Sequence, residues 1–427
     1  MNKIYPKILV LSHNSFSNTR NNGKTLESIF SILPKDHLFQ LFFNNDNPDF
    51  SFCDNYFRIT DNDVLKKIFF INNNCGNVVQ SNNSTKSDKH SSKTTTNFLY
   101  SKASSFKLIR DILWKTNTWK TQSLYKWIND FTPNIIFFVG GNSGFSHNIA
   151  VYLSKLYSLP LVTYFTDDYL LYSKPRNTLE VIQKHRIRNF YNKTINHSSL
   201  LFAIGDLMAD EYTNHFKKKF HPIMNSIPIE PYDKYENKSI KIISYFGGLH
   251  LNRWKMIVRL ASIIKSPNIV INVYTNSIIT DEMEFEFNTC GVIVKKPLEG
   301  DELKNEIKKS DILLHVESDD KFNRALTKLS ISTKIPEYLM SGRFILGFGP
   351  IEVASMRLIH DNGVGMVISS DLSDNDLVEK LDDIISNYEL RKEIGLRGYD
   401  FAISNFDNSK NSALFMQKIN KLLEYES

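Results

Sequence analysis

The most constraining feature of this sequence is a recurring alternation between short apolar runs and longer segments of helical periodicity. Runs such as LVTYF at 161–165 and IVINVY at 269–274 carry no charged residue, which is typical of strands covered on both faces of a parallel sheet. The segments between the runs are long enough for the crossover helices that parallel strands require. The pattern therefore predicts an α/β protein with doubly wound sheets.

The apolar runs fall into two series. The first series comprises the runs at 7–12, 38–43, 135–139, 161–165 and 200–204. The second comprises the runs at 240–246, 269–274, 292–294, 311–316 and 343–348. Between them, HPIMNSIPIEPY at 221–232 holds three prolines that oppose a continuous helix or strand, which is typical of a linker. Because 427 residues suffice for two cores, we expect Rossmann-like domains at 1–220 and 240–410, a linker at 221–239 and a final helix at 411–427.

Cysteine usage and charge exclude several other classes of protein. Cys53, Cys75 and Cys290 lie far apart without a C-x-x-C pattern, so a disulfide framework and a structural zinc site are excluded. The apolar stretch near the N-terminus is too short for a signal peptide or a membrane span. A net charge of +6 permits anionic partners without requiring nucleic acid. We expect a cytoplasmic protein.

Two neighbouring segments of the first series depart from the alternation. Residues 72–97 are almost wholly Asn, Ser, Thr and Lys, which predicts a mobile surface loop. Residues 98–131 interleave apolar and basic residues, which indicates an amphipathic helical region. Its apolar face favours packing on the sheet, and its basic face is compatible with the inner face of the plasma membrane, with Trp114 and Trp119 at the interface. Nucleic-acid binding is the weakest interpretation, since no such motif accompanies the charge.

The segment SISTKIPEYLMSGRFILGFGP at 330–350 is the most informative motif. Ser332 and Thr333 stand where a helix N-cap is expected, with Lys334 in the first turn and Glu337 one turn further on. Backbone N–H groups at a helix start beside a lysine form an anion site suited to a diphosphate, and Glu337 could accept hydrogen bonds from a ribose diol. A plain capped helix with a solvated Lys and Glu explains the same residues equally well.

The string S-x-S-T-K-I-P-E-Y-L-x-S-G-R-x-I-L-x-x-G-P resembles the donor-binding segment of retaining glycosyltransferases with the GT-B fold, of the family 4 type. The segments at 301–318 and 362–385 are also similar to that family, so the resemblance covers about 200–425 well and the first 200 residues loosely. It implies two Rossmann-like domains facing a central cleft, with Lys334 and Glu337 holding a nucleotide diphosphate sugar.

The resemblance also implies a biological setting. The acceptor would be a glycan or lipid-linked glycan, in the biosynthesis of a surface polysaccharide such as capsule or O-antigen, and the hexosyltransferase-like reaction would need no cofactor and no metal. The final helix at 411–427 would cross back to the N-terminal domain. Two alternatives stay open: a sugar-nucleotide epimerase of the same fold, and a bilobal nucleotide-sugar-binding protein without catalysis.

The sequence departs from the family pattern in two places. Many members carry a glutamate eight positions before the one that corresponds to Glu337, where this chain has Leu329. Many also carry an arginine directly after the glycine that closes the first strand of the C-terminal domain, where this chain has Gly248. Arg253 or Lys255 could supply the missing cation, because a leaving diphosphate needs fixed positive charge. Ordinary helix-surface charge is the alternative for both residues.

Further donor contacts are expected where loops follow strands. Gly23 would let the backbone approach a phosphate, although a turn glycine without a ligand explains it nearly as well. Glu317 ends a strand and faces the donor sugar by position. The remaining candidates around the nucleotide are Gly248 and, about the base, Asn276, Lys295 and Pro297.

Catalytic candidates follow strands of the first series. Asp167 and Asp168 come directly after LVTYF, where one carboxylate could orient or deprotonate the acceptor hydroxyl. Helix capping is the alternative for one of the two, and a metal site is disfavoured because D-D is not the D-x-D motif. His147 could line the acceptor side, although a lone histidine is more often structural.

Overall fold

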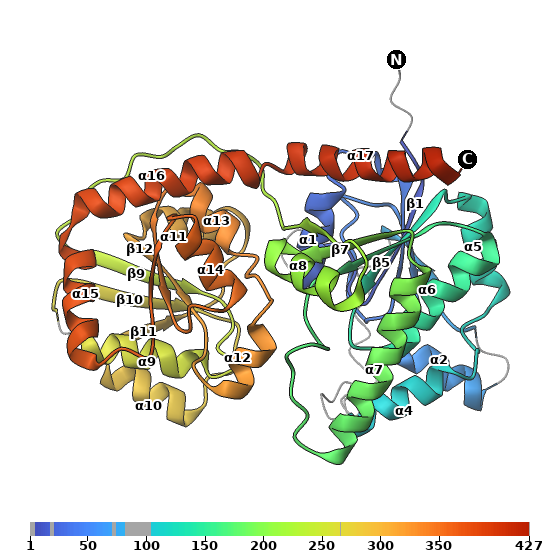
Figure 1. Ribbon diagram of the computed structural model, residues 1–427, viewed down its shortest axis with the longest axis horizontal. Coiled ribbons are helices and arrows are strands. Elements are labelled where there is room, and N and C mark those ends of the chain that lie inside the picture. The colour runs from blue at the N-terminus through green and yellow to red at the C-terminus, as the bar shows by residue number, and fades with distance from the viewer. Residues whose placement is uncertain (1–4, 18–20, 71–73, 82–103, 265, 427) are drawn as a thin grey trace. The chain divides into compact units, whose positions relative to one another are not determined.

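The computed structural model describes residues 5–17, 21–70, 74–81, 104–264 and 266–426. The chain divides into two compact units. Unit 1 contains Met1–Met224 together with Ser412–Ser427, and unit 2 contains Asn225–Asn411. Each unit has its own sheet with helices around it (Figure 1).

The sheet of unit 1 has eight strands in the order β4-β3-β2-β1-β5-β6-β7-β8. All neighbouring strands pair in parallel except β3 and β4, which are antiparallel. The strands are β1 (Ile8–Ser12), β2 (Leu38–Phe42), β3 (Asn55–Arg58), β4 (Asn77–Val79), β5 (Ile135–Gly140), β6 (Leu161–Phe165), β7 (Leu200–Ile204) and β8 (His221–Ile223). Chain order reverses between β1 and β5, which makes their carboxyl ends the topological switch point of this unit.

Helices cover both faces of this sheet. They are α1 (Asn21–Ile29), α2 (Asp61–Phe69), α4 (Ser104–Trp114), α5 (Gln122–Phe131), α6 (Gly144–Tyr157), α7 (Thr178–His197) and α8 (Gly205–Phe216), with a short 3₁₀ helix, η1 (Lys35–His37). Phe138 of β5 packs against His147 of α6, with ring centroids 4.9 Å apart. The preceding residue, Phe137, instead contacts Phe415 of α17 (Asn408–Glu426), with centroids 5.7 Å apart. Because side chains alternate along a strand, α6 and α17 lie on opposite faces of the sheet.

The sheet of unit 2 has six parallel strands in the order β11-β10-β9-β12-β13-β14. The strands are β9 (Lys241–Phe246), β10 (Ile269–Tyr274), β11 (Val292–Lys295), β12 (Ile312–Val316), β13 (Phe344–Phe348) and β14 (Met366–Ile368). The helices are α9 (Arg253–Ile263), α10 (Asp281–Thr289), α11 (Gly300–Lys309), α12 (Lys321–Thr327), α13 (Ile335–Met340), α14 (Ala354–Asp361), α15 (Asp374–Ser386) and α16 (Tyr388–Asn405). The switch point of this unit lies between β9 and β12.

Two predictions about irregular segments are wrong in part. The prolines of 221–232 do not prevent a strand, because β8 is an edge strand in which Pro222 pairs with Ala203 of β7 on one side only. Within the predicted loop at 72–97, residues 77–79 form β4, which pairs with β3, and Cys75 is buried. Residues 72–73 and 82–97 of that predicted loop lie outside the described residues.

The amphipathic region at 98–131, described from residue 104 onward, forms α4 and α5. Trp114 and Trp119 are only 2% and 4% exposed, so the prediction that they stand at a membrane interface is wrong. Burial of Trp114 is compensated by a polar partner, because its indole Nε1 donates to Asp61 Oδ1 at 2.7 Å. Trp114, Trp119, Leu124 and Trp127 are therefore core, as the packing interpretation predicted, whereas Ile109 and Ile112 of α4 are exposed.

Candidate active site

The carboxyl ends of β9 and β12 bring together two of the predicted donor residues. Gly247 and Gly248 follow β9, α9 begins at Arg253, and Glu317 directly follows β12. Arg253 Nη2 donates to both oxygens of Glu317, at 3.0 and 3.1 Å. The pair thus bridges the switch point, where ligands of open parallel sheets bind.

The ion pair is shielded from solvent. The side chain of Glu317 is 4% exposed and that of Arg253 is 18% exposed. Burial raises the pKa of Glu317, and the nearby guanidinium offsets part of that increase. Burial disfavours the charged form of Arg253, but Glu317 and Tyr245 more than compensate, so the Arg253 pKa is raised above its ordinary value. The result is a fixed cation at the edge of the sheet.

His315 and Ser355 complete this cluster and were not predicted. His315 Nε2 lies 2.9 Å from Ser355 Oγ and 3.7 Å from Glu317 Oε1. Burial, with the positive charge of Arg253, lowers the pKa of His315 to about 3, so the imidazole is neutral at pH 7. His315 lies inside a strand predicted from its apolar pattern, so only its place one residue before the carboxyl end of the strand could have signalled a role.

The motif at 330–350 lies beside the same switch point. The Phe246 backbone N–H at the end of β9 donates to the Tyr338 hydroxyl of α13 at 3.2 Å, and Tyr338 follows Glu337 in the chain. Lys334 Nζ lies 3.4 Å from Glu337 Oε2. The structure therefore places Lys334 and Glu337 in contact with each other, close to the end of β9.

The predicted N-cap pair of this motif does not cap the helix. The N-cap of α13 is Lys334, and no side chain accepts a capping hydrogen bond there. Ser332 Oγ instead accepts from the Lys334 backbone N–H at 3.3 Å, which stabilises the turn before the helix. The Thr333 carbonyl accepts from Asn225 Nδ2 at 3.2 Å. Both residues thus shape the approach to the helix.

The remaining donor candidates lie on the β9-β10-β11 side of the sheet. The Gly248 carbonyl accepts from the Tyr245 hydroxyl at 2.7 Å. Phe246 and Tyr274 stack at the ends of β9 and β10, with centroids 4.7 Å apart and planes 11° apart. Lys295 Nζ donates to the Tyr274 hydroxyl at 3.3 Å. Four candidates here are solvent-exposed, namely Lys255, Asn276, Lys295 and Pro297.

Gly23 of unit 1 lies in the first turn of α1. A Cβ at this position would come within 2.5 Å of the Ser15 carbonyl oxygen and 2.7 Å of the Ser17 backbone nitrogen. Close approach to the loop after β1 is thus sufficient to require a glycine, without a ligand. This contact favours the structural alternative for Gly23.

His13 stands at the switch point of unit 1 and was not predicted. It directly follows β1, and its Cδ2 is 3.6 Å from where a Cβ on Gly141, after β5, would stand. Its ring packs edge-on against Phe43 and Phe145, with centroids 5.8 and 5.5 Å away. Burial, together with the charge of Arg110, lowers its pKa to about 3. Its Nε2 is buried and has no hydrogen-bond partner among the described residues.

Asp167 and Asp168 differ sharply in their surroundings. Asp168 is 2% exposed, and its oxygens accept from the backbone N–H groups of Leu170, Leu171 and Tyr172, each at 2.9 Å, and from the Tyr212 hydroxyl at 3.0 Å. These four bonds favour a structural role for Asp168, which binds the N–H groups of a turn and not those of a helix. Asp167 is half-buried, and the hydroxyls of Thr166 and Tyr169 lie 3.4 Å from its Oδ2. Asp167 is therefore the more accessible of the two carboxylates.

His147 is 1% exposed, inside α6. Its Nε2 lies 2.9 Å from the Gly141 carbonyl, which can only accept, so Nε2 carries the proton and Nδ1 accepts from Thr194 Oγ1 at 3.0 Å. Burial lowers its pKa to about 4. With both ring nitrogens bonded, the contacts of His147 favour a structural role.

Among the residues described, no group of three or more His, Cys, Asp or Glu side chains is placed to hold a metal ion. No helix in the described part of the chain has the length and apolar character that a membrane span requires.

Several solved structures share this architecture. HepE (Alr3699) from Anabaena, solved in complex with UDP, has 11% identity and a TM-score of 0.65, over 97% of this chain and 100% of that one. Sucrose-phosphate synthase from Thermosynechococcus elongatus has 9% identity and a TM-score of 0.66, over 98% and 99% of the two chains. WaaG, a glycosyltransferase involved in lipopolysaccharide biosynthesis, has 12% identity and a TM-score of 0.58, over 96% and 99%. No protein-family profile and no curated protein matches the sequence.

These likenesses confirm the predicted fold class. The chain has the GT-B fold, an α/β architecture of two Rossmann-like units, each built on a mainly parallel sheet with a switch point. Because the identities are 9–12%, the likeness concerns the fold. Membership of family 4 stays a prediction.

Proposed function

We propose that this protein is a glycosyltransferase that moves a sugar from a nucleotide diphosphate donor to a glycan or lipid-linked glycan acceptor. One observation carries the proposal: a buried carboxylate holds the guanidinium of Arg253 at the β9/β12 switch point. HepE was solved with UDP and with UDP-glucose, and a nucleotide diphosphate is the ligand that such a cationic site fits.

Arg253 and Lys334 would stabilise the leaving group. A nucleotide diphosphate gains negative charge as its bond to the sugar breaks, and fixed cations lower the energy of that transition state. In the free protein these two cations pair with Glu317 and Glu337. A diphosphate would compete with both carboxylates, which leaves Glu337 to accept hydrogen bonds from the ribose. We infer a metal-independent reaction, and the family resemblance supports retention of configuration.

Asp167 would serve the acceptor. A half-buried carboxylate after β6 can orient a hydroxyl group or remove its proton if the two come within hydrogen-bond distance. His13 is neutral and has an unpartnered ring nitrogen among the described residues, so it suits a hydroxyl better than a phosphate. This division assigns the donor to unit 2 and the acceptor to unit 1.

Surface polysaccharide assembly, of capsule or O-antigen type, on the cytoplasmic face of the plasma membrane would provide a lipid-linked acceptor. We propose that α4 contributes a peripheral contact to that membrane. Ile109 and Ile112 on α4 are 47% and 59% exposed, and Lys115 follows the helix as an exposed cation. Apolar side chains beside a cation suit the surface of an anionic membrane.

The function is tested in two steps. The folded protein should melt at a higher temperature with one of UDP, GDP, ADP or CMP, because a ligand of the native state stabilises it. Incubation with the corresponding nucleotide sugars and a panel of glycan acceptors should then release the nucleotide and extend an acceptor, in EDTA as well. Conversion of the donor sugar without nucleotide release would identify an epimerase. An intact donor with every acceptor would favour the non-catalytic binding protein.

A further inference from the structure

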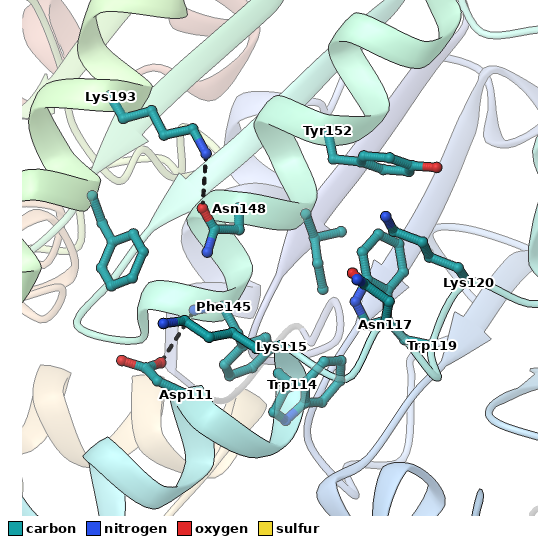
Figure 2. Close-up of a pocket in the computed structure, with 12 residues that line it drawn as sticks. Asp111, Trp114, Lys115, Asn117, Trp119, Lys120, Phe145, Asn148, Tyr152 and Lys193 are labelled. Carbon is teal, nitrogen blue, oxygen red and sulfur yellow. Dashed lines mark hydrogen bonds between the residues drawn. The ribbon is translucent and has the colours of Figure 1, made fainter. Parts of the chain in front are cut away.

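Unit 1 contains a cavity of about 290 Å³ that none of the proposed donor or acceptor residues lines. Its walls come from the end of α4, the connection to α5, one side of α6 and the second half of α7 (Figure 2). The lining residues are Asp111, Trp114, Lys115, Asn117, Trp119, Lys120, Phe145, Asn148, Ile149, Tyr152, Phe190 and Lys193. The cavity is close to the lower end of the range for small-molecule pockets, roughly 300 Å³, so it fits one sugar ring with a substituent and is too small for a nucleotide.

The charge of the lining is positive. Three lysines line the cavity, Lys115, Lys120 and Lys193. The one lining acid, Asp111, is already paired, because its Oδ2 lies 3.3 Å from Arg186 Nη2 and its Oδ1 accepts from the Phe145 backbone N–H at 3.2 Å. The lysine charges are therefore not neutralised by the wall. An anionic group is the ligand that offsets them.

Two of the three lysines, Lys120 and Lys193, are held by residues of the cavity wall. Lys120 Nζ lies 3.8 Å from the centroid of the Tyr152 ring and 5.5 Å from that of Trp119. Lys193 lies across the cavity from Lys120 (Figure 2). Its Nζ donates to Asn148 Oδ1 at 3.0 Å. Cation–π contact and hydrogen bonding limit the freedom of both ammonium groups, so less entropy is lost when a ligand binds.

The aromatic residues provide a second kind of contact. The Trp119 and Tyr152 rings meet edge to face with centroids 5.4 Å apart, and Tyr152 is only half-buried. Trp114 and Phe145 also line the cavity, where their rings stack with centroids 4.1 Å apart. The C–H groups of a pyranose pack well on aromatic rings, and the amide groups of Asn117 and Asn148 match its hydroxyls. A free inorganic anion would use the lysines and leave these surfaces unused.

We propose that this cavity binds an acidic sugar, a pyranose that carries a carboxylate or a phosphate. The anionic group contacts Lys120 and Lys193, and the ring packs on the aromatic wall. The inference depends only on the cavity, so it stands whether or not the chain transfers sugars. Phe145 also contacts His13 at the switch point, which connects the two places through one ring.

The test measures binding to the full chain by calorimetry, without a donor. The probes are glucuronic acid, glucose 6-phosphate, glucose, inorganic phosphate and vesicles containing phosphatidylglycerol. We expect binding of one or both acidic sugars, and weaker binding of glucose and of inorganic phosphate by about tenfold or more, because each lacks one of the two contacts. Tighter binding of glucuronic acid would indicate that the cavity prefers a carboxylate, and tighter binding of glucose 6-phosphate would indicate a phosphate.

Lys193→Ala and Lys120→Gln should each weaken that binding by about tenfold. Lys155→Ala, an exposed residue of α6 outside the cavity, should leave it unchanged and serves as the matched control. Melting temperatures establish that the variants fold, and Lys193 is exposed enough for its truncation to be tolerated. No binding of an acidic sugar, equal affinity for inorganic phosphate, equal affinity in both lysine variants, or binding of vesicles alone would each overturn the proposal.

Discussion

The two sheets reverse their chain order in the same way, yet different side chains stand at the two switch points. At β9 and β12 a buried ion pair joins Arg253 to Glu317. At β1 and β5, His13 packs against the rings of Phe43 and Phe145 and faces Gly141, just after the neighbouring strand. The topology of a sheet therefore determines where a ligand binds, whereas the residues just after the strands determine the chemistry of the binding site.

The contrast predicts different consequences for substitutions in the two units. The charged strand ends of unit 2 suit the phosphates of a donor. The strand ends of unit 1, with a neutral histidine and a half-buried carboxylate, suit the hydroxyl of an acceptor. Changes in unit 1 should then affect turnover and leave donor affinity intact, and changes in unit 2 should affect both.

The largest effect is expected from Asp167→Asn. Removal of a general base lowers kcat by roughly 10²- to 10⁴-fold, and donor affinity measured by calorimetry should be preserved. Asp168→Asn is the matched control. In this variant an amide nitrogen would face the Tyr172 backbone N–H, which now donates to Asp168 Oδ2. Because two donors would then face each other, the variant should lose about 1–3 kcal/mol of folding stability and keep its turnover. The opposite pattern, with turnover lost only in Asp168→Asn, would contradict the assignment.

Arg253→Ala should be next in size. Loss of the cation beside the leaving diphosphate should lower kcat by roughly 10²- to 10³-fold, by analogy with the removal of one oxyanion-stabilising donor. Arg253→Lys should recover part of the activity, because the charge returns without the planar fork. Lys380→Ala, an exposed cation on α15, is the control. Normal turnover in Arg253→Ala would remove the switch-point ion pair from the reaction.

Lys334→Ala should have a smaller effect, on donor affinity. One charge-assisted contact is worth about 1.5–3 kcal/mol, which corresponds to a Kd about 10- to 100-fold higher. The fold should be unaffected, because Lys334 is 28% exposed and its described ion-pair partner is the neighbouring Glu337. Calorimetry with the donor nucleotide measures the change. An unchanged Kd would show that the motif at 330–350 is a plain helix start whose Lys334 and Glu337 contact no donor.

The smallest expected effect concerns acid stability and His147. Its folded-state pKa of about 4 lies below the ordinary value of 6.5, so between these pH values the unfolded chain binds the extra proton and stability falls as pH falls. His147→Asn should be less stable at pH 7 but should lose about 2 kcal/mol less than the wild type between pH 7 and pH 5. Unfolding in urea at several pH values measures this difference. An equal pH dependence of the unfolding free energy in both proteins would show that His147 does not cause the loss of stability at low pH. His185→Asn, at an exposed position of α7, is the control.

The central strands could be predicted because each is a continuous apolar run that is buried on both faces. β6, β7 and β10 have the predicted bounds. The edge strands β4 and β8 could not, because one side of an edge strand needs no ladder partner and so tolerates Asn77 and Pro222. The short strands β3 and β14 were also missed.

The sequence predicted residues of the candidate site only where the position of a residue relative to a strand end decides what it contacts. Arg253 and Glu317 each stand near a strand end, and the sheet order brings them together. The difference between Asp167 and Asp168 was not accessible, because both follow the same strand and only the backbone turn decides which of them points inward to the N–H groups of 170–172. His13 and His315 were missed because a single histidine beside or within an apolar run has no distinguishing pattern.

Helix α17 contributes to unit 1, which limits how the two units can be produced separately. Unit 2 is one continuous stretch of chain, whereas unit 1 is assembled from two pieces, so in the linear order of the gene unit 2 is an insertion into unit 1. The second piece is part of the N-terminal core, since Phe415, Met416 and Ile419 are at most 4% exposed and Ser412 Oγ donates to the Ile29 carbonyl at 2.7 Å. A fragment that ends at residue 224 would expose this core and should aggregate. Independent production of the N-terminal unit would require residues 412–427 to be supplied in trans or joined through a new linker.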